Sequence, residues 1–177
     1  MRLFLAVEIP EALKKILGDI QEELKPKIKS KLTWVRPEQM HITLKFLGEV
    51  GEDAIPEILT SLSSIKIIPF SLRLQRLGCF PNARNPRVLW AGYEESQELK
   101  ELHGRVDSAV SQWFEQEKHF KGHVTIARVK YIEESGSVAE ILNAITLPPF
   151  TMDVSGITLF SSELKGDGPI YTLVATF

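Results

Sequence analysis

The stretch His41-Ile42-Thr43-Leu44 has a counterpart in the second half of the chain, His123-Val124-Thr125-Ile126, and the two together decide the expected fold. Each has the order histidine, apolar, threonine, apolar. In a β-strand, successive side chains point to opposite faces of the sheet. Each strand is therefore expected to present its histidine and threonine on one face and to send its two apolar side chains into the core.

A second similarity between the two halves of the chain lies outside these motifs. The segment from Pro69 to Phe80 matches the segment from Pro149 to Phe160. Chance similarity between two alternating strands would explain one such match alone. The separation of positions 69 and 149 is nearly the same as that of positions 41 and 123. Because two independent segments give nearly the same offset, we predict that the chain is built from a duplicated lobe.

Hydrophobic spacing supplies the other elements. It predicts strands at residues 3–9, 41–47, 70–77, 88–93, 123–129 and 152–159, and helices at residues 11–24, 55–65 and 99–114. Strands and helices are interleaved, and no linker rich in glycine or serine separates them. We therefore expect the α+β class, with residues 1–177 forming a single domain.

Composition limits the classes of protein that the chain can represent. Of its 177 residues, 44% are hydrophobic and 25% are charged, which is typical of a globular protein. The net charge of −2 argues against a protein that coats nucleic acid, so any nucleic-acid substrate would be bound through a local contact. No apolar run suits a membrane span or an export signal, and the single cysteine, Cys79, argues against disulfides and thiolate zinc sites. We expect a cytoplasmic protein without a membrane partner.

A pair of histidines suits the cleavage of a phosphoester. The ordinary histidine pKa, about 6.5, allows one copy to accept a proton while another donates one at neutral pH. An in-line displacement at phosphorus places the attacking and leaving oxygens on opposite sides, so His41 and His123 could address both. Thr43 and Thr125 are expected to donate hydrogen bonds to the non-bridging oxygens.

Two cations near the motifs are further candidates for binding the substrate phosphate. Lys45 keeps the strand parity of His41 and Thr43, which places it on the same predicted face. Arg128 has the wrong parity for a regular strand, so its participation requires a β-bulge or the end of the strand.

Other chemistries lack their sequence signatures. The chain has no GxxxxGK[ST] loop, no HExxH and no Cys/His cluster, so we expect neither a metal nor a cofactor. A serine or cysteine nucleophile paired with one histidine stays open, although it leaves the second motif unexplained. His103 and His119 are interpreted as structural or exposed residues.

These residues resemble the two-histidine phosphoesterase superfamily, and within it the prokaryotic RNA 2',3'-cyclic phosphodiesterase family, also known as 2'-5' RNA ligase. The similar segments are residues 2–7, 41–48, 86–92, 123–128 and 168–171. The resemblance implies a bilobal fold, in which two pseudo-symmetric antiparallel sheets flanked by helices enclose a central groove.

The resemblance also implies an activity, which is metal-free hydrolysis of an RNA terminal 2',3'-cyclic phosphate to a 2'-phosphate. His41 would donate a proton to the leaving 3' oxygen and His123 would activate water, although the residues alone do not order the two roles. The reverse reaction would join RNA ends through a 2'-5' linkage. We expect a monomer that acts on RNA, with tRNA fragments among the candidate substrates. The alternative is a non-catalytic RNA- or nucleotide-binding module of the same fold.

Overall fold

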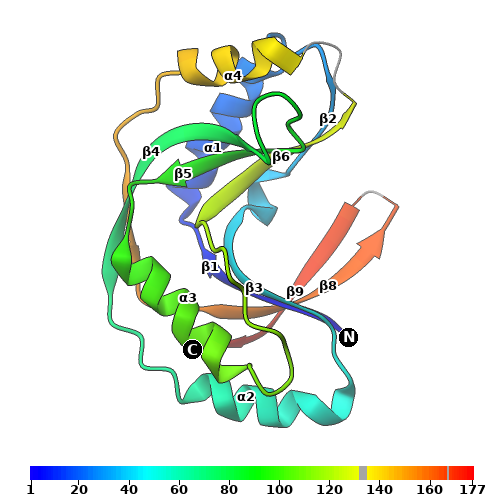
Figure 1. Cartoon of the computed structure of the whole chain (residues 1–177), viewed down its shortest axis with the longest axis vertical. Helices are drawn as coiled ribbons and strands as arrows, with labels where there is room; N and C mark the ends of the chain where they lie inside the picture. Colours follow the sequence, from blue (N-terminus) through cyan, green and yellow to red (C-terminus); the bar gives the residue numbers. More distant parts are fainter. Residues whose placement is uncertain (132–134, 167) are drawn as a thin grey trace.

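The computed structural model describes residues 1–131, 135–166 and 168–177, which form a long, curved antiparallel sheet with helices near both ends (Figure 1). The strands in this part of the chain are β1 (Arg2–Glu8), β2 (Lys31–Trp34), β3 (His41–Glu49), β4 (Phe70–Phe80), β5 (Val88–Tyr93), β6 (His123–Tyr131), β7 (Thr151–Val154), β8 (Thr158–Lys165) and β9 (Gly168–Thr176). The helices are α1 (Glu11–Leu24), α2 (Ile55–Ser63), α3 (Gln97–Ala109) and α4 (Ser135–Ala144), with short 3-10 turns at Pro37–Gln39 and Glu52–Ala54.

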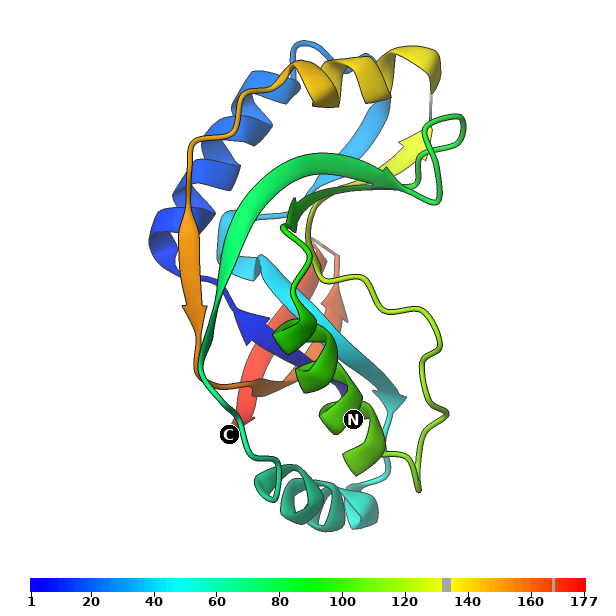
Figure 2. The same cartoon turned by 60° about the vertical axis from the view of Figure 1, so that its left-hand side comes forward.

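The strands are hydrogen-bonded in the order β7-β4-β5-β6-β3-β1-β8-β9, with β2 paired to β6. All of these pairs are antiparallel, which confirms the predicted α+β class. Helices α1 and α4 lie at one end of the molecule, and α2 and α3 lie at the other (Figures 1 and 2). The two expected sheets form one continuous path, because β3 pairs with β6 where Ile42 faces Val124.

Most of the predicted elements are present, and the exceptions have local causes. The strand expected at residues 152–159 is divided into β7, which pairs with β4, and β8, which pairs with β1 and β9. Strands β2 and β9 and helix α4 are not among the elements predicted from the sequence. Helix α1 follows Pro10 and buries Leu13, Leu17, Ile20 and Leu24 along one face, as its helical spacing predicts.

The positions matched by the predicted repeat face one another in the sheet. In the β4–β7 pair, Leu72 lies opposite Met152, and the match of the Pro69 and Pro149 segments makes these two positions equivalent. In the β3–β6 pair, Ile42 lies opposite Val124, and both are the second residue of their histidine motif. A two-fold rotation between the halves would produce this pairing. The arrangement supports duplication, and the two lobes stay a prediction.

Each histidine strand contains a β-bulge at the fourth residue of its motif. Strand β1 pairs with Thr43 and then Lys45, leaving Leu44 without a partner in that ladder. Strand β5 likewise pairs with Thr125 and then Ala127, leaving out Ile126. An extra residue in one strand inverts the alternation of side chains beyond it.

The burial pattern shows this inversion in both strands. From the histidine to the third residue after the motif, β3 and β6 have the same order of partly buried, buried and exposed positions. After the bulge, Lys45 and Ala127 are buried, whereas Phe46 and Arg128 are exposed. Two segments far apart in the chain therefore share an irregularity as well as a motif.

None of the helices in the described parts of the chain combines the length and the apolar character that crossing a membrane requires.

The contact between β3 and β6 should be measurable in the stability of the protein. Ile42 and Val124 are fully buried, so Ile42→Ala should lower the free energy of unfolding by about 2–5 kcal/mol in urea titrations. In a double-mutant cycle with Val124→Ala, we expect a coupling of about 0.5–3 kcal/mol, because contacting residues are not additive. Leu164→Ala, at a position 69% exposed, is the control and should change stability by about 0.5 kcal/mol or less. Strict additivity of the buried pair would contradict the contact.

Candidate active site

His41 begins β3 and is held by its own chain. Its Nδ1 lies 2.7 Å from the carbonyl oxygen of Gln39, and its Nε2 lies 3.0 Å from Oγ1 of Thr43. A carbonyl can only accept, so Nδ1 carries the proton and Nε2 is the nitrogen that can exchange one. Aromatic rings fix the imidazole further, with ring centres 4.9 Å away at Phe4 and 5.5 Å away at Tyr171.

His123 begins β6 and is held in the same way. Its Nδ1 lies 2.7 Å from the carbonyl oxygen of Lys121, again the residue two positions earlier. The edge of its ring meets Phe80 at 5.0 Å between centres, and Trp90 lies at 6.3 Å. Both histidines therefore have a fixed tautomer and leave Nε2 for proton transfer.

Burial lowers the pKa of both histidines below the ordinary value of 6.5, because a partly dehydrated imidazole disfavours the charged form. The carbonyls at Nδ1 oppose this shift. The charge of His123, and after it that of Arg128, lowers the pKa of His41 further. The charges of Lys121 and then Arg128 lower the pKa of His123, and Glu117 raises it by a smaller amount. The two rings and the guanidinium thus lie close enough to interact, and both histidines are ready to act as bases at neutral pH.

The threonines and Arg128 lie where the bulged strands place them. Thr43 and Thr125 are partly buried and precede the bulges, so they share a face with their histidines. Arg128 follows the bulge at Ile126, which returns its side chain to that face. The bulge that Arg128 requires to face the histidines is therefore present. Contact of Arg128, Thr43 and Thr125 with a substrate stays a prediction.

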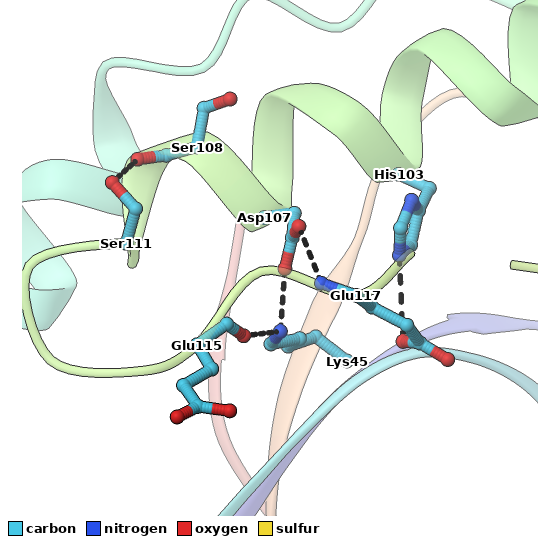
Figure 3. A network of polar contacts seen from close by, with 7 residues as sticks. All are labelled: Lys45, His103, Asp107, Ser108, Ser111, Glu115 and Glu117. Atoms are coloured by element: carbon cyan, nitrogen blue, oxygen red, sulfur yellow. Dashed lines mark hydrogen bonds and ion pairs between the residues drawn. The ribbon is translucent and has the colours of Figure 1, made fainter. Parts of the chain in front are cut away.

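Lys45 requires a correction. Its side chain is buried, and Nζ lies 2.5 Å from Oδ1 of Asp107 and 2.5 Å from the carbonyl oxygen of Glu115 (Figure 3). In a regular strand Lys45 would share the face of His41, whereas the bulge at Leu44 turns Lys45 away from that face. Its charge is committed to an internal ion pair and is not free for a phosphate.

The ion pair of Lys45 belongs to a network that holds the segment before β6. Oδ2 of Asp107 accepts a hydrogen bond of 2.9 Å from the backbone nitrogen of Glu117, whose carboxylate lies 3.5 Å from Nε2 of His103 (Figure 3). His103 is buried in α3 and stacks on Phe120 at 4.0 Å between ring centres, in agreement with its predicted structural role. Phe120 immediately precedes Lys121, so the network steadies the residue whose carbonyl orients His123.

A cavity of about 570 Å³ opens beside these residues. It is lined by Thr43, Leu44, Lys45, Phe46, Phe80, His123 and the segment 117–121, which includes the exposed His119. Lys45 thus borders this cavity, although its ammonium is paired with Asp107. The two phenylalanines, Phe46 and Phe80, are not among the site residues predicted from the sequence. The internal repeat could have pointed to both phenylalanines. Phe46 occupies the same position in the first motif strand as Arg128 does in the second, and Phe80 matches Phe160.

A pair of packed aromatic side chains lies beside each of the two histidines. Phe4 contacts His41 and stacks on Phe160 at 5.4 Å, while Trp90 lies near His123 and packs on Phe80 at 5.0 Å. In the described residues, no group of three or more His, Cys, Asp or Glu side chains could hold a metal ion.

The antiparallel sheet of this α+β fold carries a repeated histidine and threonine motif on two adjoining central strands. These features define the class of phosphoesterases that use two histidines. This chain belongs to the family described as LigT like Phosphoesterase, whose model matches residues 7–90 and 93–171.

Known proteins resemble the whole chain. A protein of Archaeoglobus fulgidus named RNA 2',3'-cyclic phosphodiesterase is 37% identical, with 100% of this chain and 99% of that protein covered. A protein of Methanocaldococcus jannaschii with the same name is 36% identical over 98% of each chain. The crystal structure of a Thermus thermophilus protein, TT0787, superposes with a TM-score of 0.80 at 32% identity, covering 100% of this chain and 97% of the other.

The buried ion pair should behave as a unit. Asp107→Ala leaves the Lys45 ammonium buried without a carboxylate and should lower the free energy of unfolding by about 3–5 kcal/mol. The double change Lys45→Met with Asp107→Leu should be less destabilising than Asp107→Ala, because it leaves no isolated charge. Chemical denaturation of the variants measures both. If Asp107→Ala lowers the free energy of unfolding by less than about 1 kcal/mol, the pair is no stronger than an exposed ion pair and the prediction is contradicted.

Proposed function

We propose that this protein hydrolyses the 2',3'-cyclic phosphate at the end of an RNA. The observation that carries the proposal is that two histidines on adjoining strands have the same fixed tautomer and share the field of Arg128. One base and one acid are what an in-line displacement at phosphorus requires. The curated relatives named RNA 2',3'-cyclic phosphodiesterase act, by that name, on the same bond.

The proposed reaction has one phosphoryl transfer and two proton transfers. Nε2 of His123 removes a proton from water, and the water oxygen bonds to phosphorus. The bond between phosphorus and the 3' oxygen breaks, and Nε2–H of His41 donates its proton to that oxygen. The products are a 2'-phosphate and a free 3' hydroxyl. Arg128, Thr43 and Thr125 stabilise the charge on the non-bridging oxygens. The same steps in reverse, with a ribose hydroxyl in place of water, would form a 2'-5' linkage.

The lowered pKa of His41 is compatible with its role as an acid. In the free protein, burial and the charge of Arg128 favour the neutral ring. A bound cyclic phosphate brings a negative charge beside the ring and offsets Arg128, which favours protonation. The substrate thereby helps to charge the acid that it needs.

The cavity also suits the nucleoside part of an RNA end. Phe46 is 62% exposed and lines the cavity that contains His123, so a base can stack on its ring. We propose RNA ends, including those of tRNA fragments, as substrates. A monomer is the acting unit in this proposal, since one chain supplies both histidines. The single cysteine suits a cytoplasmic setting.

Replacing either histidine should abolish turnover and preserve binding. We expect His41→Ala and His123→Ala each to lower kcat by about 10²–10⁴-fold on an oligoribonucleotide ending in a 2',3'-cyclic phosphate, because each removes one proton transfer. Binding of the same oligoribonucleotide ending in a 2'-phosphate is the control and should change much less. If the unaltered protein binds the oligonucleotide and leaves the ring closed, the non-catalytic module is the correct reading.

Activity should follow a bell-shaped pH profile, and the positive charge of Arg128 should shift both of its limbs to lower pH. Since burial places both histidine pKa values below 6.5, the protonated acid is depleted above that pH and kcat/KM should fall there. On the acid side, kcat/KM falls because the base becomes protonated. Arg128→Gln removes a positive charge and raises both pKa values, so both limbs should move to higher pH while the maximum falls. A flat profile between about pH 5 and 9, or limbs that stay in place, would contradict this account.

A further inference from the structure

A second cavity, of about 460 Å³, adjoins the candidate active site. Phe120 and Lys121 line both cavities, so the two are separated by little more than these side chains. The walls of the second cavity come from β4, β5, the start of α3 and the segment before β6. Its lining includes Arg76, Trp90 and Lys100, and none of the catalytic residues proposed above.

Two cations converge on one indole ring in this cavity. Nζ of Lys121 lies 4.6 Å and Cζ of Arg76 lies 5.6 Å from the centre of the Trp90 ring. Throughout the described ranges, no carboxylate comes within ion-pair distance of either cation. The ring attracts each cation, but the two positive charges repel each other. An anion bound in the cavity that both cations line would offset that repulsion.

The acidic residues of the same cavity are already paired. Glu95 is bound by Lys100, and the carboxylate of Glu94 lies 3.7 Å from Nε of Arg73. Within the part of the chain that the structure describes, these pairs leave Arg76 and Lys121 as the cations of the cavity without a counter-charge. The cavity therefore presents its uncompensated charge at the Trp90 ring.

The ring that holds the two cations is firmly seated. Trp90 is 3% exposed, and its buried Nε1 has no hydrogen-bond partner among the residues that the structure describes. A Cβ at Gly78 would come within 2.3 Å of the indole, and one at Gly92 within 2.6 Å. A side chain at either position would clash with the indole. The glycines of β4 and β5 are therefore required for the Trp90 ring to occupy this position.

We propose that this cavity is an upstream subsite, which binds the phosphodiester preceding the terminal nucleotide of the RNA. The inference rests on the proposed function, because the reacting phosphate must lie at His123 for the preceding one to pass Lys121. An arginine that forms no ion pair with a carboxylate can donate parallel hydrogen bonds from its planar guanidinium to phosphate oxygens. Helix α3 has 13 residues and begins at Gln97, directly after its N-cap residue Ser96 at this cavity, and the dipole at its first turn also favours an anion.

The other side of the site is less suited to a phosphate chain. The hairpin of β8 and β9 exposes Leu164, Ile170 and Leu173, and its Lys165 lies 3.5 Å from the carboxylate of Glu163. These apolar side chains and the paired lysine offer little to a phosphodiester, although the positive charge of Arg2 also reaches Tyr171 of β9. The two uncompensated cations at Trp90 favour an RNA strand that leaves past Lys121.

The test compares a short RNA with a cyclic mononucleotide. Arg76 is exposed, so Arg76→Gln should fold normally. We expect it to lower kcat/KM about tenfold for a tetranucleotide ending in a 2',3'-cyclic phosphate, as loss of a charged hydrogen bond implies. For 2',3'-cyclic AMP, which has no upstream phosphate, kcat/KM should stay within about twofold. The dependence of the tetranucleotide kcat/KM on salt should become shallower by about 0.7 in logarithmic slope, as expected for one lost contact to a single strand.

Arg105→Gln is the matched control, because Arg105 lies on α3, donates to the carbonyl of Lys66 and lines neither cavity. It should affect neither substrate. Binding of adenosine 2'-phosphate and of the tetranucleotide 2'-phosphate gives a second readout without turnover, and only the tetranucleotide should bind more weakly to Arg76→Gln. Equal losses on both substrates, or no loss on either, would overturn the subsite while leaving the proposed function intact. If the unaltered protein opens neither ring, the proposed function fails and the subsite fails with it.

Discussion

The pairing of Ile42 with Val124 is the contact on which the rest of the site depends. It joins the two halves of the sheet through the residues that directly follow the two histidines. Because each histidine is adjacent to this pair and is locked by the carbonyl two positions earlier, the sheet sets the relation between the two rings. The effect of His123 on the pKa of His41, and the effect of Arg128 on both, follow from that closeness. Backbone geometry thus prepares the acid and base chemistry before any substrate arrives.

The two bulges add a second constraint. In a regular strand Lys45 would join His41 on the same face and Arg128 would be turned away. The extra residue in each strand reverses both outcomes, so one cation reaches the histidines and the other enters the interior. There, Lys45 ties α3 to the segment that ends at Lys121, whose carbonyl orients His123. The bulge in the first strand therefore supports the histidine of the second one.

Much of this arrangement could be predicted from the sequence, because strand parity and repetition are local properties. The faces of His41 and Thr43, the buried role of Ile42 and the condition attached to Arg128 all follow from alternation. Lys45 could not be placed, since a bulge is set by pairing with another strand and leaves no mark in the spacing of one strand.

Other features were missed because their sequence signal is weak. Strands β2 and β9 are only partly buried, so their apolar side chains do not form a clear alternating pattern. They are held by backbone pairing with β6 and β8, which spacing within one strand does not reveal. The two cations on Trp90 come together only in the folded sheet.

The central proposal is that the two histidines direct water to phosphorus and release the 3' oxygen. Its most direct measurement is the identity of the product formed from an oligoribonucleotide 2',3'-cyclic phosphate in the presence of EDTA, resolved by phosphorus NMR. We expect a 2'-phosphate with a free 3' hydroxyl. A 3'-phosphate as the main product, or a ring that stays closed, would contradict it.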